Sequence, residues 1–172
     1  MIIFSGNFLI RNFIQTDAFS LSRYADNPKI ASNLRDAFPS PYTLTDAEIF
    51  LARVSSQSPV ATFAIATENE AIGSIGLMIG QDVHRFSAEL GYWLAEPFWG
   101  KGIMSTAVTA VVKYGFESLG LNRIYAEPYH TNAASIRVLQ KAGFEYEGRM
   151  RANVVKKGKI LDQLLYAKIR NM

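Results

Sequence analysis

The hydrophobic period of the sequence changes from two residues to 3.6 on either side of a glycine-containing turn at 96–102. Residues 87–94 are typical of a strand, and residues 123–127 predict a second, short strand that ends at Pro128. Between them, one face of a predicted helix gathers small and apolar residues: Met104, Ala107, Val108, Val111, Gly115 and Leu119. A strand–helix–strand unit of this length suits a right-handed crossover between parallel strands.

The other periodic segments predict that the sheet is mixed rather than wholly parallel. Further strands are expected at 8–12, 60–67, 71–79, 144–151 and 160–169, and further helices at 17–26, 45–55 and 132–142. Two of the strand pairs are close enough in sequence to form antiparallel hairpins. We therefore expect an α/β (α+β) fold with a mixed sheet of about seven strands flanked by about four helices. The 172 residues suit a single domain that spans 1–172.

Local signals predict where two helices begin and which side chains the first of them buries. Asp17 is expected to cap the first helix, with Phe19, Leu21 and Tyr24 as candidate buried positions. The sequence Thr45-x-x-Glu48 matches a capping box and predicts the start of the second helix.

The composition excludes several classes of protein. The chain has no cysteine, which excludes disulfides, thiolate metal sites and a cysteine nucleophile. Its apolar runs are shorter than the roughly 20 residues of a membrane span, and Met1–Phe4 lacks the basic leader of a signal peptide. His84 and His130 have no matching carboxylate pattern, so no metal site is expected. We expect a soluble cytoplasmic protein without a membrane partner.

The net charge of +3 is unevenly distributed along the chain. Residues 149–172 hold seven basic residues and one acid, Asp162, which leaves 11 basic and 14 acidic residues in the first 148. A basic segment of this kind attracts phosphates or nucleic acid, or it forms a solvated hairpin whose lysines protect an edge strand. No pattern of stacking aromatics accompanies these residues, so nucleic acid is not expected as a substrate.

The turn at 96–102 is the segment that says most about function. Gly100 and Gly102 let the backbone approach a ligand without obstruction by a Cβ atom, and Lys101 adds positive charge. The first N–H groups of the next helix lack internal partners, so an anion such as pyrophosphate fits there. The alternative is a tight strand-to-helix turn without a ligand. Nucleoside triphosphate and dinucleotide loops are disfavoured because neither glycine spacing matches, Ser105 standing where a third glycine would be.

Six blocks, one of which overlaps this turn, form a pattern that covers nearly the whole chain, from about residue 8 to 169. They are Ala88–Leu94 followed by Trp99–Met104, then Leu119–Ile124, Asn132–Phe144, Glu147-Gly148, and Gly158-Lys159 with Asp162. In this order the blocks resemble the GNAT N-acyltransferases, and more narrowly the Rim-type subgroup, which includes the ribosomal-protein alanine N-acetyltransferases. Two positions depart from the pattern, since Trp99 replaces the usual Gln or Arg and Met104 replaces a small residue. Both departures are compatible with phosphate binding by backbone N–H groups.

The resemblance implies the GNAT fold, acetyl-CoA as the acyl donor, an amine as the acceptor and no metal. It also implies that the donor is bound by a strand end, the glycine turn and two helix starts: Tyr92, Trp93, Leu94, Trp99, Gly100, Lys101, Gly102, Ile103, Met104, Ser105, Asn132 and Ser135. For Trp93 the alternative is core packing. For Asn132 the alternative is a purely structural N-cap.

Acyl transfer to an amine requires a base for the amine and a partner for the leaving thiolate. Glu89, in an otherwise apolar strand, is the first candidate base, directly or through water, and the alternative is a structural carboxylate. Glu127 is a second candidate. Ser135 is the candidate partner of the thiolate, by resemblance. Asp162 either is structural or touches the acceptor.

The acceptor is less well defined by the sequence. Its pocket is expected to come from the loop Asn33–Tyr42 and the C-terminal strands, with Phe38, Pro39 and Tyr42 as wall residues, and His130 is a candidate neighbour. An α-amine with a pKa of about 8 is roughly 10% neutral at pH 7, so it needs less deprotonation by the base than a lysine amine does. We therefore predict acetyl transfer to a protein or peptide N-terminal α-amine by direct attack in a ternary complex. The alternatives are a small-molecule amine (polyamine, amino acid or antibiotic), a non-catalytic acyl-CoA-binding module, or a ribosome- or nucleic-acid-binding domain that uses the basic C-terminal end. A homodimer is compatible with the resemblance.

Overall fold

The computed structural model describes residues 3–5 and 8–170, and side chains from Phe8 onward. Residues 1 and 2, which belong to the segment Met1–Phe4 considered for a signal peptide, lie outside the described residues. The chain divides into two compact units, which are described separately. Unit 1 comprises Met1–Gly76 and Tyr92–Ile103, and unit 2 comprises Leu77–Gly91 and Met104–Met172. The strands β4 (Ala71–Ile79) and β5 (Ser87–Leu94) each have residues in both units.

Unit 1 begins with antiparallel strands. β1 (Ile3–Ser5), β2 (Phe8–Arg11), β3 (Thr62–Ala66) and β4 pair in this order, each antiparallel to the next. The predicted hairpin of β3 and β4 is confirmed, and β1 is a strand that the periodicity did not predict. The end of β5 is joined to β4, because the Ala95 N–H donates to the Ile72 carbonyl at 2.8 Å.

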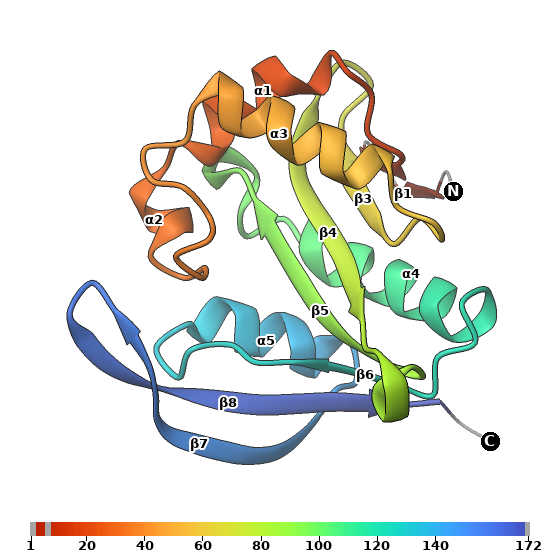
Figure 1. Ribbon diagram of the computed structural model, residues 1–172, viewed down its shortest axis with the longest axis vertical. Coiled ribbons are helices and arrows are strands. Elements are labelled where there is room, and N and C mark those ends of the chain that lie inside the picture. The colour runs from red at the N-terminus through yellow and green to blue at the C-terminus, as the bar shows by residue number, and fades with distance from the viewer. Residues whose placement is uncertain (1–2, 6–7, 171–172) are drawn as a thin grey trace. The chain divides into compact units, whose positions relative to one another are not determined.

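Three helices of unit 1 lie between β2 and β3 in the chain: α1 (Asp17–Ala25), α2 (Pro28–Ala31) and α3 (Leu44–Ser55). α1 and α3 lie side by side in Figure 1. They enclose an apolar core in which Leu21 and Leu51 are almost completely buried. Phe13, Phe38, Phe50 and Trp93 pack against this core from its edge.

Three local predictions for these helices were wrong. Asp17 does not cap α1; its carboxylate is buried and pairs with the Arg11 guanidinium at 2.7 Å, because the strand end brings a cation beside it. Phe19 is 70% exposed and lies on the outer face of α1, whereas Leu21 is buried and Tyr24 is half-buried. The capping box uses Thr43 and Asp46, which bond reciprocally, so α3 begins earlier than Thr45.

Unit 2 contains the predicted crossover. β5 and β6 (Arg123–Ala126) are parallel, with Ser87, Ala88 and Glu89 opposite Arg123, Ile124 and Tyr125. α4 (Ile103–Glu117), whose residues from Met104 onward belong to unit 2, connects the two strands. The predicted inner face of α4 is confirmed from Met104 to Gly115, whereas Leu119 lies beyond the helix end and is half-buried.

The C-terminal part of unit 2 consists of α5 (Ala133–Lys141), β7 (Glu145–Lys156) and β8 (Lys159–Ile169). β8 pairs antiparallel with β6 on one side and with β7 on the other, so β7 is the edge strand. Figure 1 shows β7 and β8 as one long hairpin. Short 3-10 turns, η1 (Asp82–His84) in unit 2 and η2 (Glu96–Phe98) in unit 1, complete the described elements.

The mixed sheet with parallel and antiparallel pairs confirms the predicted fold class. The described residues form eight strands and five α-helices, against about seven and about four expected, because β1 and the four-residue α2 are too short for a periodic signal. Among the described residues, none of the helices has both the length and the apolar composition of a bilayer span.

Candidate active site

The glycine turn has the backbone geometry that a phosphate-binding loop requires. Gly100 and Gly102 have φ angles of 76° and 78°, a region that residues with a Cβ rarely adopt. An added Cβ at either glycine would meet nothing within 4 Å, so the space beside both is open. α4 begins directly afterwards at Ile103, and its first N–H groups carry the positive end of the helix dipole. The turn therefore fits an anionic group bound by the main chain.

Trp99 ties this turn to the end of β5. Its indole Nε1–H donates to the Leu94 carbonyl at 2.6 Å, and its backbone N–H donates to the Glu96 carbonyl at 3.1 Å. The ring itself is 44% exposed. Trp99 therefore orders the start of the turn, a role that the sequence pattern did not reveal, while its predicted contact with the donor stays a prediction.

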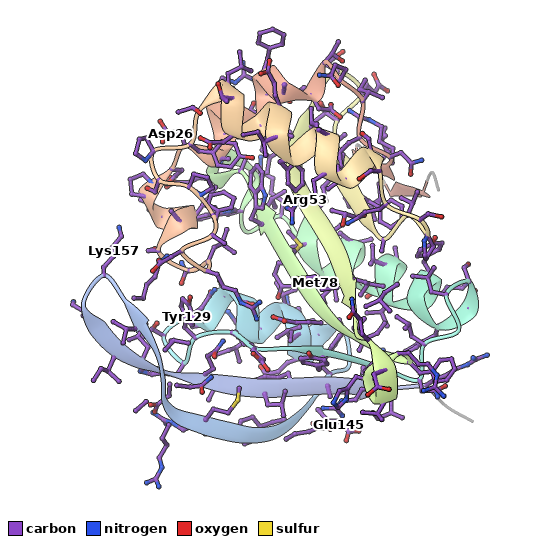
Figure 2. The ribbon with its side chains drawn as sticks, in the orientation of Figure 1. Asp26, Arg53, Met78, Tyr129, Glu145 and Lys157 are labelled. Carbon is purple, nitrogen blue, oxygen red and sulfur yellow. The ribbon has the colours of Figure 1, made fainter. Side chains whose placement is uncertain are left out.

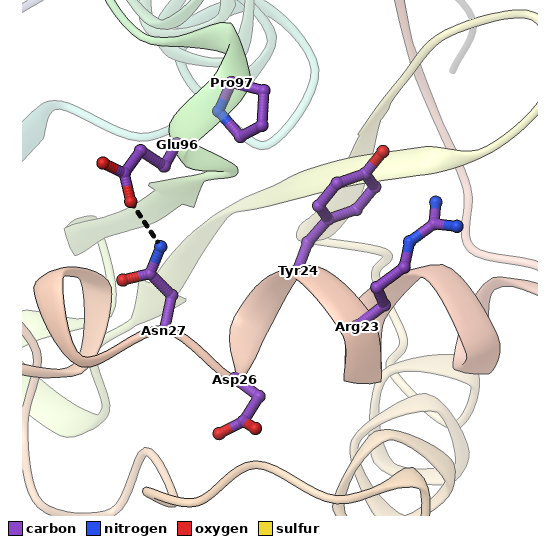
Figure 3. Close-up of a pocket in the computed structure, with 6 residues that line it drawn as sticks. All are labelled: Arg23, Tyr24, Asp26, Asn27, Glu96 and Pro97. Carbon is purple, nitrogen blue, oxygen red and sulfur yellow. Dashed lines mark hydrogen bonds between the residues drawn. The ribbon is translucent and has the colours of Figure 1, made fainter.

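Glu96, at the start of η2, anchors the turn to the helices of unit 1. The Asn27 side chain donates to Glu96 Oε2 at 2.8 Å, and the Lys29 ammonium forms an ion pair with Glu96. These hydrogen bonds, Lys29 first, lower the pKa of the Glu96 carboxyl group. Figure 3 shows the Asn27–Glu96 bond beside a pocket of about 390 Å³ lined by Arg23, Tyr24, Asp26, Asn27, Glu96 and Pro97.

Lys101 lies at the centre of the turn with its Nζ atom 5.4 Å from the centroid of the Phe98 ring. The side chain is exposed, so its charge is available at the surface of the turn. Phe98 in turn packs edge-on against Tyr24, with ring centroids 6.1 Å apart. The ammonium group over the Phe98 ring puts a positive charge on the turn, while the predicted contact of Lys101 with the donor stays a prediction.

β5 carries both the candidate base, Glu89, and the predicted donor-binding residues at its C-terminal end. Its pairing with β6 ends at Glu89 opposite Tyr125, although β5 itself continues to Leu94. Glu89 is half-buried at this last paired position. Trp93 packs against the core of unit 1, with its ring 6.1 Å from that of Phe38. The packing interpretation of Trp93 is thus confirmed, and donor binding by Tyr92, Trp93 and Leu94 stays a prediction.

The start of α5 is built by Asn132. The Asn132 side-chain oxygen accepts from the Ser135 N–H at 3.1 Å, as an N-cap does. Both residues are half-buried. The N-cap interpretation of Asn132 is therefore confirmed, and contact of Asn132 and Ser135 with a donor stays a prediction. Ile103, Met104 and Ser105 form the first turn of α4, where Ile103 and Met104 are buried and Ser105 is half-buried.

Asp162 has structural partners within the β7–β8 hairpin. Its carboxylate accepts from Arg149 Nε at 2.6 Å and from the Ala152 N–H at 2.7 Å. The Ala152 bond, followed by Arg149, lowers the pKa of Asp162. The Asp162 N–H also donates to His130 Nδ1 at 3.2 Å, and the His130 N–H donates to the Asp162 carbonyl at 3.0 Å. Asp162 thereby holds both the hairpin and the segment after β6.

A buried polar side chain that the sequence did not indicate lies next to Asp162. Gln163 is 5% exposed, donates to the Glu127 carbonyl at 3.0 Å and accepts from Asn153 Nδ2 at 2.5 Å. Gln163 thus fixes the backbone at Glu127, the second candidate base, which is half-buried. Side chains of β8 alternate between the two faces of the sheet. The inward position of Gln163 can therefore be identified only when the register of β8 against β6 is known.

The loop expected to line the acceptor pocket is packed by aromatic side chains. Phe38 and Tyr42 lie with ring centroids 5.0 Å apart, and Pro39 is half-buried beside them in sequence. Burial raises the pKa of Tyr42 to about 12, so it is a neutral phenol at physiological pH. Its backbone N–H donates to Asp26 Oδ1 at 3.0 Å. These contacts make Asn33–Tyr42 an ordered segment of unit 1, and its acceptor role stays a prediction.

The fold is that of an acetyltransferase. The family model of the acetyltransferase (GNAT) domain matches residues 7–145. The chain belongs to this family, which confirms the resemblance drawn from the sequence blocks.

Relatives and solved structures agree with the family. An uncharacterized N-acetyltransferase p20 of Bacillus licheniformis is 30% identical over 172 residues, covering 98% of this chain and 96% of the relative. A spermidine N(1)-acetyltransferase of Escherichia coli K12 is 28% identical over 122 residues, covering 70% of this chain and 64% of that protein. The structure of RimL, a ribosomal L7/L12 α-N-protein acetyltransferase in complex with coenzyme A, matches with a TM-score of 0.87 at 22% identity, covering 98% of each chain.

Proposed function

We propose that this protein transfers an acetyl group from acetyl-CoA to the α-amine at the N-terminus of a protein or peptide. The observation that carries the proposal is the open, left-handed backbone at Gly100 and Gly102, directly before α4. Membership of the GNAT acetyltransferase family supports the same reaction.

The donor's diphosphate is proposed to bind the main-chain N–H groups between Trp99 and Ser105. The space beside both glycines is what a close approach of phosphate oxygens to the backbone requires, so this turn fits the group. The Lys101 ammonium adds charge from the same turn. Leu94, at the end of β5, is proposed to contact the pantetheine arm through its backbone.

Acetyl-CoA supplies an activated acetyl thioester when bound. Glu89 is proposed to take a proton from the attacking amine, directly or through a water, as the C–N bond forms and the C–S bond breaks. The Ser135 hydroxyl is proposed to donate a hydrogen bond to the leaving sulfur. No cysteine is present to carry the acetyl group, which supports direct attack over that covalent route.

An α-amine is favoured over a polyamine as the acceptor for two reasons. An α-amine has a pKa of about 8, so roughly a tenth of it is already neutral at pH 7. Glu89 therefore has to deprotonate it less than it would a polyamine. The chain also has a net charge of +3, which does not concentrate polycations around it. The spermidine acetyltransferase among the relatives nevertheless makes a polyamine the second candidate.

Release of free thiol from acetyl-CoA, measured against a panel of amines, tests the proposal. The panel contains peptides that differ in their first residue, the same peptides blocked at the N-terminus, spermidine, and single amino acids. Turnover on free but not blocked peptides is expected. Faster turnover on spermidine than on every peptide would contradict the α-amine assignment, and no turnover on any amine would contradict the activity.

A further inference from the structure

The tip of the β7–β8 hairpin presents an exposed aliphatic pair among basic side chains. Val155 and Ile160 lie opposite each other in the strand register and are 64% and 68% exposed. Lys157 and Lys159 flank them, and both are exposed. Figure 2 labels Lys157 at the end of the hairpin. We call the surface formed by Val155, Lys157, Lys159 and Ile160 the hairpin tip.

The backbone holds the hairpin tip in a defined shape. Lys157 and Gly158 have φ angles of 50° and 74°, so the two turn residues are left-handed, as a tight two-residue hairpin turn requires. Asparagine and glycine are the residues usually favoured there, whereas this chain places a lysine at the first position. A lysine thus occupies a left-handed backbone conformation that it rarely adopts, and its positive charge lies at the end of the hairpin.

A β-bulge just before the hairpin tip fixes the orientation of the tip. The acid that holds this bulge is also the one whose negative charge would oppose the lysines. The register shifts between Met150 and Val154, and Ala152 has a φ of 52°. Asp162 holds the bulge by accepting from the Ala152 N–H, and its carboxylate also pairs with Arg149 at 2.5 Å. The only acid in residues 149–172 is therefore neutralised locally, and the remaining charge of the segment is positive.

Charge complementarity identifies the class of partner. We propose that the hairpin tip is a docking surface for an acidic segment of the protein acceptor, which rests on the proposed function. Carboxylates of such a segment pair with Lys157 and Lys159, while its apolar side chains cover Val155 and Ile160. A second copy of this chain docked tip to tip would place lysines against the same lysines. RNA is disfavoured because the exposed tip residues are aliphatic and offer no ring for a base to stack on.

Binding of labelled peptides, measured by fluorescence anisotropy at low salt, tests this surface independently of catalysis. Three peptides share the same first six residues and continue with an aspartate- and glutamate-rich, a neutral or a lysine-rich sequence. We expect the acidic peptide to bind at least about tenfold more tightly than the neutral one, with the difference shrinking as salt is raised. Equal binding of the three peptides would overturn the proposal.

Two variants locate the binding. Lys157→Glu with Lys159→Glu is expected to weaken acidic-peptide binding at least about tenfold, and Val155→Ser with Ile160→Ser about fivefold with little dependence on salt. Lys113→Glu on α4 and Val83→Ser on η1 are matched controls, because both side chains are exposed and lie outside the hairpin. Unchanged binding in the tip variants, or equal loss in the controls, would overturn the proposal.

An RNA or a second copy of this chain bound at the hairpin tip would give different results. Displacement of the acidic peptide by a 12-residue single-stranded RNA of higher affinity would overturn the assignment to a protein partner. Dimerisation in sedimentation runs that Val155→Ser with Ile160→Ser abolishes would assign the tip to a second copy. Tip-dependent binding of the acidic peptide without acetylation of any peptide would leave the surface standing and reject the proposed function.

Discussion

The indole Nε1–H of Trp99 donates to the Leu94 carbonyl at 2.6 Å and thereby joins the glycine turn to the end of β5. The two residues are five positions apart in sequence, so the bond closes a short loop that contains η2. The Asn27 and Lys29 contacts of Glu96 hold the same loop from the other side. The proposed donor site thus begins with a backbone that contacts within the chain hold on both sides.

Trp99→Phe keeps an aromatic ring and removes this hydrogen bond. We expect coenzyme A to bind roughly three- to tenfold more weakly, because one lost hydrogen bond of about 1 kcal/mol loosens the start of the turn. Isothermal titration calorimetry with coenzyme A measures the effect. Phe19→Leu, which alters an exposed ring on α1, is the control, and equal affinity of Trp99→Phe and wild type would refute this role of Trp99.

Gly102→Ala and Gly120→Ala separate ligand binding from backbone strain. Both glycines have a positive φ with open space around them, so each alanine is expected to lower stability by about 1 kcal/mol. Only Gly102→Ala is expected to weaken coenzyme A binding, because its methyl group enters the space proposed for the phosphate. Thermal unfolding and calorimetric titration of both variants measure the two effects. A similar affinity for coenzyme A in both would contradict the proposed geometry.

Glu89→Gln tests the proposed base. Turnover with acetyl-CoA and the best amine of the panel is expected to fall about 10²–10⁴-fold, while the affinity for coenzyme A stays unchanged. Glu145→Gln, an exposed carboxylate at the start of β7, is expected to retain wild-type turnover. Steady-state kinetics over a range of pH measure the turnover of both variants. Wild-type turnover in Glu89→Gln would eliminate this residue as the base.

The crossover around α4 was predictable because its helix is long and buries one continuous apolar face. The Asp17 ion pair was not predictable, because a capping residue and an ion-pair partner have the same local sequence signal. Only the packing of α1 beside the end of β2 brings Arg11 close enough to decide between the two. The start of α3 shows the same limit, since Thr43 and Thr45 each have an acid three residues later and the backbone at Thr43 is the one that is extended.

The candidate site was predictable where the chemistry is local and unpredictable where it is tertiary. Glycine at 100 and 102 permits the left-handed backbone found there, and asparagine at 132 favours the N-cap that it forms. The bond that Gln163 makes to the Glu127 carbonyl depends on the register of β8 against β6. The bulge at Ala152 was also missed, because an alanine with a positive φ has no signature in the sequence.

Asp162→Asn tests the structural role of this carboxylate through pH. Its folded-state pKa lies below the ordinary value of 3.8, first because of the Ala152 N–H and then because of Arg149. The stabilisation is therefore fully present above the unfolded pKa and is lost as the pH falls through the folded pKa. We expect the free energy of unfolding to be higher for wild type than for Asp162→Asn near neutral pH, with the difference shrinking below a pH of about 4.

Urea unfolding of both proteins between neutral and acidic pH measures this difference. Asp82→Asn, which changes an exposed acid on η1, is the control. A gap between wild type and Asp162→Asn that stays constant through the acid range would show that the carboxylate charge contributes nothing to folding.

A crystal structure of the protein with coenzyme A shows where the diphosphate binds. We expect the diphosphate oxygens to lie within hydrogen-bonding distance, about 3 Å, of the main-chain N–H groups between Trp99 and Ser105. A diphosphate bound elsewhere on the molecule, with these N–H groups facing only water, would contradict the proposed donor site.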